Sequence, residues 1–216
     1  NDLLPQDVAW VPPIGDEQAT TLIGNDDDNE LSGLGGNDEV YGGAGNDLLS
    51  GGADNDTIFG EAGEDALSGG NNDDSLEGGA DDDRLFGNNG NDVINGGFGD
   101  DVTNGGSGND TINGGEDDDN VLVGGADDDE VSGGAGADGI NGSSGDDLLR
   151  GDGGADRIFG GTGEDTLQGG TENDTLGGLG DADTLEGGDG EDGLNGGGGD
   201  DLMDGGADDD RLFGGT

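Results

Sequence analysis

The chain has 216 residues, of which 57 are glycine and 55 are aspartate or glutamate, against four arginines and no lysine, histidine or cysteine. Its formal net charge is −51, and only 26% of its residues are hydrophobic. Nucleic acid and anionic membranes would repel such a chain, and its apolar residues are too few for an ordinary globular core, so the composition favours metal cations as partners.

Residues 1–23 contain no repeat. They hold all three prolines and the only tryptophan, Trp10, with Val8 and Val11 beside it. This content is unlike a polar linker, so we expect the segment to pack against the rest of the chain or against another copy.

From Gly24 onward the chain can be cut every nine residues, as in GGAGNDLLS at 42–50, GGSGNDTIN at 105–113 and GGTGEDTLQ at 160–168. There are 21 such repeats between residues 24 and 213, with Val123 as one extra residue that shifts the frame. The first position is always Gly. The sixth is Asp in 20 of 21 repeats, and the eighth is a large aliphatic residue in 20 of 21.

A nine-residue period of this kind predicts a solenoid. We expect each repeat to hold a three-residue strand, with the eighth position facing inward, and a six-residue turn in which glycine permits positive φ. Two repeats then form one 18-residue coil with a strand on each side. Stacked at about 4.8 Å, the coils predict a rod of about ten coils, roughly 50 Å long.

The pattern G-G-x-G-x-D-x-U-x, with U a large aliphatic residue, resembles the repeats-in-toxin (RTX) nonapeptide over residues 24–216. The resemblance implies an all-β, right-handed parallel β-roll, with Ca²⁺ held between the turns of repeats n and n+2 by sixth-position carboxylates and backbone carbonyls. The metal ligands it implies are Asp38, Asp47, Asp56, Asp65, Asp74, Asp83, Asp92, Asp101, Asp110, Asp119, Asp129, Asp138, Asp147, Asp156, Asp165, Asp174, Asp183, Asp192, Asp201 and Asp210.

The 21 turns leave about 19 gaps between stacked turns, and Ca²⁺ in every gap would bring about +38 against −51. We therefore expect nearly full loading. Because the apolar core is thin, calcium rather than the core is predicted to hold successive coils together.

A few repeats depart from the pattern. Asn29 lacks the sixth-position charge and predicts a weak or empty first site. Thr103 places a hydroxyl in the core stack, and Val123 indicates a strand bulge. In GGADDDRLFG, which occurs at 78–87 and 205–214, Asp81 and Asp208 replace the fourth-position Gly. They are expected to adopt left-handed geometry, either as solvated turn residues or as additional ligands.

Outward positions carry one more pattern, in which an Arg precedes a Phe by two residues. All three Arg-x-Phe units fall in odd-numbered repeats and should share one face of the rod. The pattern fits either packing on the sheet surface or an interaction stripe. The units are Arg84 with Phe86, Arg157 with Phe159, and Arg211 with Phe213.

Catalysis is not expected, because the chain has no His, Cys or Lys and no H-E-x-x-H motif. Two functions remain open. One is a calcium-stiffened structural module of a surface layer, adhesin or fibre; the other is the carrier region of a secreted enzyme or toxin that folds outside the cell. Weak calcium sites suit an extracellular location. Residues 1–23 are expected either to cap their own rod or to bridge end to end to the Gly214 end of another copy.

Overall fold

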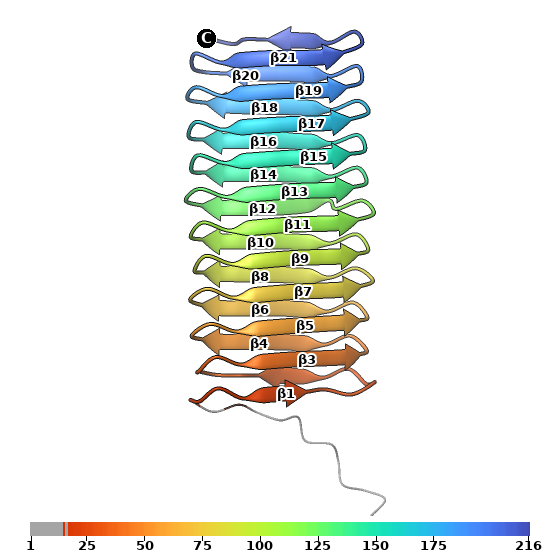
Figure 1. The fold of residues 1–216 in the computed structure, drawn as a ribbon, viewed down its shortest axis with the longest axis vertical. Helices are drawn as coiled ribbons and strands as arrows, with labels where there is room; N and C mark the ends of the chain where they lie inside the picture. The colour runs from red at the N-terminus through yellow and green to blue at the C-terminus, as the bar shows by residue number, and fades with distance from the viewer. Residues whose placement is uncertain (1–14, 16) are drawn as a thin grey trace, which may run out of the picture.

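The chain forms a rod of stacked β-coils in this computed structural model, which describes residue 15 and residues 17–216. The described residues form 22 strands and no helix, and therefore no helix long and apolar enough to span a membrane. The strands lie in two 11-stranded parallel sheets, and consecutive strands alternate between them (Figure 1). The predicted all-β parallel β-roll is confirmed, with about eleven coils rather than ten.

One sheet contains the odd-numbered strands and the other the even-numbered strands. The odd-numbered strands are β1 (Thr21–Ile23), β3 (Glu39–Ala44), β5 (Thr57–Ala62), β7 (Ser75–Ala80), β9 (Val93–Phe98), β11 (Thr111–Glu116), β13 (Glu130–Ala135), β15 (Leu148–Gly153), β17 (Thr166–Thr171), β19 (Thr184–Asp189) and β21 (Leu202–Ala207). The even-numbered strands are β2 (Glu30–Ser32), β4 (Leu48–Ala53), β6 (Ala66–Asn71), β8 (Arg84–Asn89), β10 (Val102–Ser107), β12 (Val121–Ala126), β14 (Gly139–Ser144), β16 (Arg157–Thr162), β18 (Thr175–Gly180), β20 (Gly193–Gly197) and β22 (Arg211–Phe213).

Most strands are six residues long, so the expected three-residue strand and six-residue turn are wrong. Strand β4 covers the last three positions of one repeat and the first three of the next. The glycine pair continues the ladder instead of leaving it, as shown by the pairing of Gly52 with Gly70 in β4 and β6. Only positions four to six remain for the turn.

The core is a double column of eighth-position side chains enclosed between the two sheets. Thr103 stands in this column, fully buried, and its hydroxyl has no hydrogen-bond partner, as its position in the repeat predicted. The first-position glycines from Gly33 onward are also buried, and they let the neighbouring backbone approach closely. The buried apolar residues are Leu22, Leu31, Val40, Leu49, Ile58, Leu67, Leu76, Leu85, Ile94, Ile112, Leu122, Val131, Ile140, Leu149, Ile158, Leu167, Leu176, Leu185 and Leu194.

The extra residue is accommodated in a different place from the predicted one. Val123 pairs in register with Asn104 of β10, so there is no bulge at this residue. The additional residue is Asn120, which lies between the end of a turn and the start of β12. Inserted there, it keeps Asp119 in its turn and places Leu122, rather than Val121, in the core column. The column of sixth-position aspartates and the column of core side chains are thus both preserved.

The solenoid begins before residue 24. Thr21–Ile23 form β1, which pairs with β3, and Leu22 is buried in the core. The Gly15 N–H donates to the Ser32 carbonyl oxygen at 2.8 Å. Both Gly15 and β1 therefore take part in the first coil. Trp10 and the rest of the expected cap or bridge lie outside the described residues, and that expectation remains a prediction.

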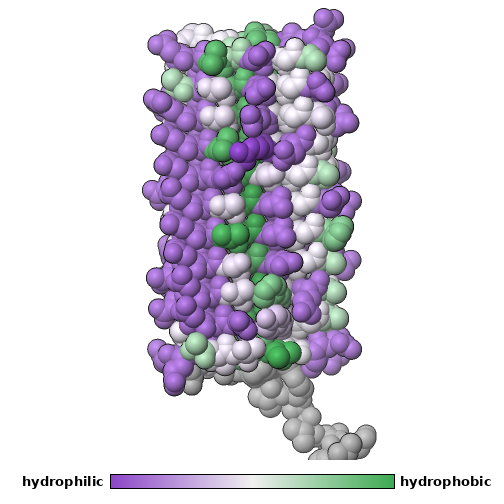
Figure 2. All heavy atoms as spheres, viewed as in Figure 1, coloured by the Kyte–Doolittle hydropathy of each residue, from purple (hydrophilic) through white to green (hydrophobic). Residues whose placement is uncertain are grey.

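Outward side chains differ along the width of the rod. Figure 2 shows one face, on which hydrophilic residues dominate the left edge, hydrophilic and intermediate residues mix on the right, and an interrupted apolar column runs along the middle. The Arg-x-Phe units lie on β8, β16 and β22 of the even-numbered sheet, so the prediction that they share a face is confirmed. On the odd-numbered sheet, Tyr41 and Phe59 stack with their ring centroids 4.9 Å apart.

Candidate metal centre

Each turn ends in its sixth-position aspartate, which sits immediately before a strand. From Asp38 to Asp192 these side chains are at most 3% exposed. One carboxylate oxygen, Oδ1, accepts the backbone N–H of the sixth-position residue one coil earlier. In one example, the Asp65 N–H donates to Asp83 Oδ1 at 2.8 Å. Nineteen such bonds of 2.7–3.1 Å are divided between two ladders, one along each edge of the rod.

The second oxygen of each of these carboxylates is buried without a partner. In the described residues, Oδ2 of all the predicted ligands except Asp210 lacks any hydrogen bond. An unpaired buried polar group is costly, and an unpaired charge more so. The same unpaired oxygen recurs in nineteen repeats at one position, which indicates a site for a cation that binds oxygen ligands.

In many repeats, the first-position glycine lies between an unpaired Oδ2 and a backbone carbonyl of the next coil. At Gly42, an added Cβ would collide with Asp47 Oδ2 and would lie 2.8 Å from the carbonyl oxygen of Gly60, one coil later. The carboxylate Oδ2 is a close neighbour of the first-position glycine in all twenty repeats that have a sixth-position aspartate. This explains why the position excludes side chains, and it brings together oxygens from two successive coils.

Left-handed backbone recurs at the second position, within the strand, and at the fourth position, where the turn begins. Every described non-glycine residue with positive φ occupies one of these positions, including Asp81 (φ 76°) and Asp208 (φ 74°). The predicted left-handed geometry of the fourth-position aspartates is therefore confirmed. In the run of three aspartates at 81–83, the first supports the turn conformation and the third enters the buried ladder.

Burial makes the ladder carboxylates weak acids. Loss of hydration raises the pKa of Asp74, Asp83 and Asp119 to about 7, and that of Asp56 and Asp101 to about 6. The backbone N–H that each accepts acts in the opposite direction, and neighbouring carboxylates raise the pKa further. Without a counter-charge, the folded turns therefore resist ionisation at neutral pH.

The donor set fits Ca²⁺, a hard cation that takes six to eight oxygens from carboxylates and carbonyls. Among the described residues no three acidic side chains gather at one point, because the ladder supplies one carboxylate per turn. Backbone carbonyls of the glycine turns would therefore supply the remaining ligands. Bound there, calcium would provide the positive charge that the buried carboxylates lack.

The two ends of the ladder differ from its middle. Asn29 is buried, but its Oδ1 accepts the N–H of Asn25 within the same turn at 2.7 Å. The weak or empty first site remains a prediction. At the other end, Asp201 and Asp210 are only partly buried, and Asp210 Oδ1 accepts the Asp192 N–H at 3.0 Å.

A second ladder was not predicted from the sequence. Polar fifth-position side chains accept the N–H of the fifth-position residue one coil later, as Asp82 Oδ1 does from Asp100 at 3.0 Å. Ala137 donates its N–H to Asp118 Oδ1 in the same way. The frequent Asn or Asp at this position was the available signal. These side chains are exposed, and they bond to backbone rather than facing the buried gap.

The fold and its turns define a parallel β-solenoid whose successive coils are joined through buried carboxylates. The family model for the RTX calcium-binding nonapeptide repeat matches overlapping segments that together span residues 14–216, and the chain belongs to this family. RTX repeats bind Ca²⁺ between turns. A search of curated proteins finds no match.

Proposed function

We propose that the chain is a non-enzymatic structural module that folds on binding Ca²⁺ outside the cell and serves in a surface layer, adhesin or fibre. The observation that carries this proposal is the series of buried, unpartnered Oδ2 atoms, one for each sixth-position aspartate from Asp38 to Asp201. Because each of these carboxylates already bonds through Oδ1 to the preceding coil, and many lie beside a carbonyl of the next coil, cation binding would link the coils in sequence along the whole rod.

The proposed ligands are the twenty sixth-position aspartates, in roughly 19 gaps between stacked turns. Weak individual sites would fill at the millimolar calcium concentrations found outside cells and stay empty inside them. Folding would thus be confined to the extracellular space. End-to-end association through residues 1–23 and the Gly214 end belongs to the same proposal.

The alternative is a carrier region that helps a linked enzyme or toxin leave the cell and folds afterwards. Calcium coupling supports both functions equally. The acidic residues of the strands lie almost entirely on the odd-numbered sheet. This difference favours the structural module, because a carrier has no need of two chemically different faces.

Circular dichroism across a calcium titration, combined with sedimentation and with Mg²⁺ as the control ion, tests the proposal. We expect little β-signal in chelator, a cooperative gain with Ca²⁺, and a much smaller response to Mg²⁺, which demands tighter octahedral geometry. A β-signal unchanged by chelation would refute calcium-dependent folding.

A further inference from the structure

The two faces of the rod carry different charges. The odd-numbered strands hold nine acidic residues, whereas the even-numbered strands hold none after Glu30 in β2. Ten consecutive strands of one face, β4 to β22, are thus free of acid in a chain with 55 acidic residues. The acids of the odd-numbered face are Glu39, Glu61, Glu77, Glu116, Glu130, Asp152, Glu186, Asp189 and Asp204.

Three of the four arginines lie on the even-numbered face, which has almost no acidic residues. Arg150, on the odd-numbered face, forms an ion pair with Glu130 at 2.6 Å. Arg84, Arg157 and Arg211 lie on the even-numbered face, and no ion pair or hydrogen bond engages their side chains within the described part of the chain. Three guanidinium groups therefore remain available to carboxylates from outside the molecule.

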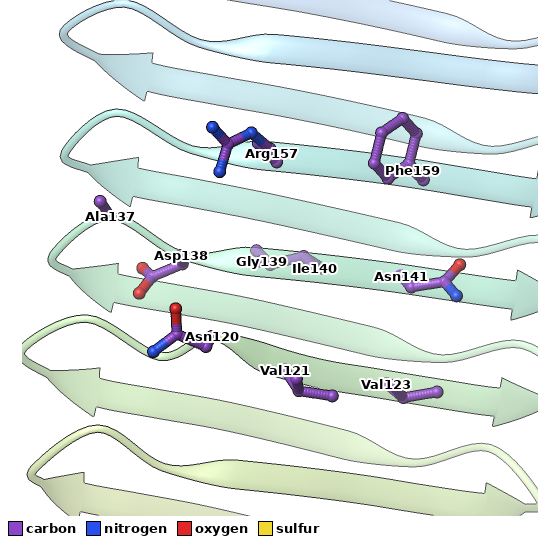
Figure 3. Close-up of a pocket in the computed structure, with 10 residues that line it drawn as sticks. All are labelled: Asn120, Val121, Val123, Ala137, Asp138, Gly139, Ile140, Asn141, Arg157 and Phe159. Atoms are coloured by element: carbon purple, nitrogen blue, oxygen red, sulfur yellow. The ribbon is translucent and has the colours of Figure 1, made fainter.

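Aromatic side chains accompany these arginines. Phe86, Phe159 and Phe213 are 39%, 38% and 62% exposed. Between β12 and β16 the surface is hollowed to a volume of about 330 Å³, bordered by Val121, Val123, Arg157 and Phe159, because Gly139 on the intervening strand has no side chain (Figure 3). Exposed aromatic and Arg residues beside a depression are typical of interface centres.

We infer that the even-numbered face stacks on the odd-numbered face of a second copy of this chain. The inference rests on the proposed structural function and adds the surface through which rods associate side by side. Charge supports this occupant, since unpaired arginines on one face would meet excess carboxylates on the other. A polyanion of another kind would lack that fixed spacing of carboxylates.

The arginines and acids also agree in register. Each arginine of the even-numbered face shares its coil with an acid on the odd-numbered face. A second rod stacked in the same direction, without sliding along the axis, brings every arginine over a coil that carries a carboxylate. The coils are β7 and β8 with Glu77 and Arg84, β15 and β16 with Asp152 and Arg157, and β21 and β22 with Asp204 and Arg211.

The available area is sufficient for a specific interface. Eleven strands at about 4.8 Å, most of them six residues long at about 3.3 Å per residue, give a face of roughly 900–1,000 Å². A standard interface buries about 800 Å² on each partner. Because the two contacting faces differ, the interface is heterologous and repeats without closing, which builds an open ribbon of parallel rods.

Charge reversal tests the pairing directly. One variant reverses the even-numbered face (R84E/R157E/R211E), and another reverses the odd-numbered face (E77R/D152R/D204R). By sedimentation at saturating calcium and physiological salt, we expect the wild type to form species larger than the monomer and each variant alone to lose them. In a mixture of the two variants, both contacts are complementary again, so the larger species should return.

A matched control separates the face from the net charge. The substitutions R84Q/R157Q/R211Q and N46D/N91D/N109D both lower the net charge by three, but the second set lies at exposed fifth positions in the turns. We expect the first set to weaken association strongly and the second to leave it nearly unchanged.

Several outcomes would overturn the inference while leaving calcium-dependent folding intact. These are a wild type that folds with calcium but stays monomeric at all concentrations, an arginine variant that associates like the wild type, and a mixture that fails to recover. A mixture of the two variants that fails to recover would assign the even-numbered face to a different partner. A wild type whose circular dichroism ignores calcium would instead refute the proposed function.

Discussion

Replacing Asp83 by Asn isolates the role of the unpaired carboxylate oxygen. The Asp83 side chain is 1% exposed, its Oδ1 accepts the Asp65 N–H at 2.8 Å, and its Oδ2 has no partner. The amide keeps the Oδ1 acceptor but replaces Oδ2 with a group that cannot bind a cation. If a cation compensates the buried charge, removing this partner should lower the free energy of unfolding by about 3–5 kcal/mol at saturating calcium.

The neighbouring Asp82 provides a matched control. D82N removes the same charge from the same turn and likewise keeps an oxygen to accept the Asp100 N–H, but its side chain is exposed. We expect a change within about 0.5 kcal/mol. Urea unfolding followed by circular dichroism at saturating calcium measures both variants, with the midpoint shift read at constant slope.

Without calcium, the effect of D83N on stability should change from destabilising to neutral or stabilising. In chelator, the neutral amide of D83N spares the chain an uncompensated buried carboxylate, so this variant should show at least as much β-structure as the wild type. Equal losses for D83N and D82N in calcium, or a loss for D83N in chelator that matches its loss in calcium, would refute the ligand role of the sixth-position aspartates.

Three further predictions address other parts of the fold. Because burial raises the pKa of Asp74 and Asp119 to about 7 from 3.8, the calcium-free fold binds more protons than the unfolded chain. Its stability should be greatest below about pH 4 and be lost as the pH rises through 7, and a pH titration of circular dichroism in chelator that shows no gain towards acid would contradict this. Gly78→Ala places a Cβ against Asp83 Oδ2 and 2.7 Å from the Gly96 carbonyl oxygen, whereas a Cβ at Gly153 meets nothing closer than 3.6 Å. G78A should therefore cost about 1–3 kcal/mol and G153A much less, and equal urea midpoints would show that the close approach is unimportant. Thr103→Val removes a buried unpaired hydroxyl and should stabilise the rod by about 1–2 kcal/mol, so a lower melting temperature for this variant would be the contrary result.

The repeat period was enough to predict the architecture because one residue class occupies each structural position. Eighth-position aliphatic residues fix the core, and first-position glycines fix the close approach of successive coils. Strand length was mispredicted because glycine is a poor strand former in isolation, yet its ladder pairs form here through the stacking of identical turns. The insertion was misplaced for a related reason. The repeat frame alone cannot tell which of several neighbouring residues is the inserted one. In the structure, Asp119 stays in its turn and Leu122 stays in the core, so the inserted residue is Asn120.

The charge difference between the faces was available in the sequence but could not be seen before the sheets were assigned. Odd and even strands alternate along the chain, so acids that are evenly scattered in the sequence become segregated only when alternate strands are collected. The three Arg-x-Phe units gave a partial signal, because their shared parity was evident. The absence of acids around them needed the full six-residue strands.

The ladder geometry also indicates where a calcium-bound rod would open first. Neighbouring carboxylates along one edge are one coil, about 4.8 Å, apart, and two such charges repel by roughly 3–4 kcal/mol at an effective dielectric constant of about 20. A hydrogen bond to a charged group contributes about 1.5–3 kcal/mol, so the Oδ1 bonds alone do not offset that repulsion. Cations or protons must therefore fill the gaps along the whole ladder, and a gap that empties weakens both adjoining coils. The coil at Asn29 lacks a sixth-position carboxylate, and Asp210 is only partly buried. Amide hydrogen exchange at limiting calcium should therefore be fastest in these two coils and slowest around the fully buried Asp101 and Asp119.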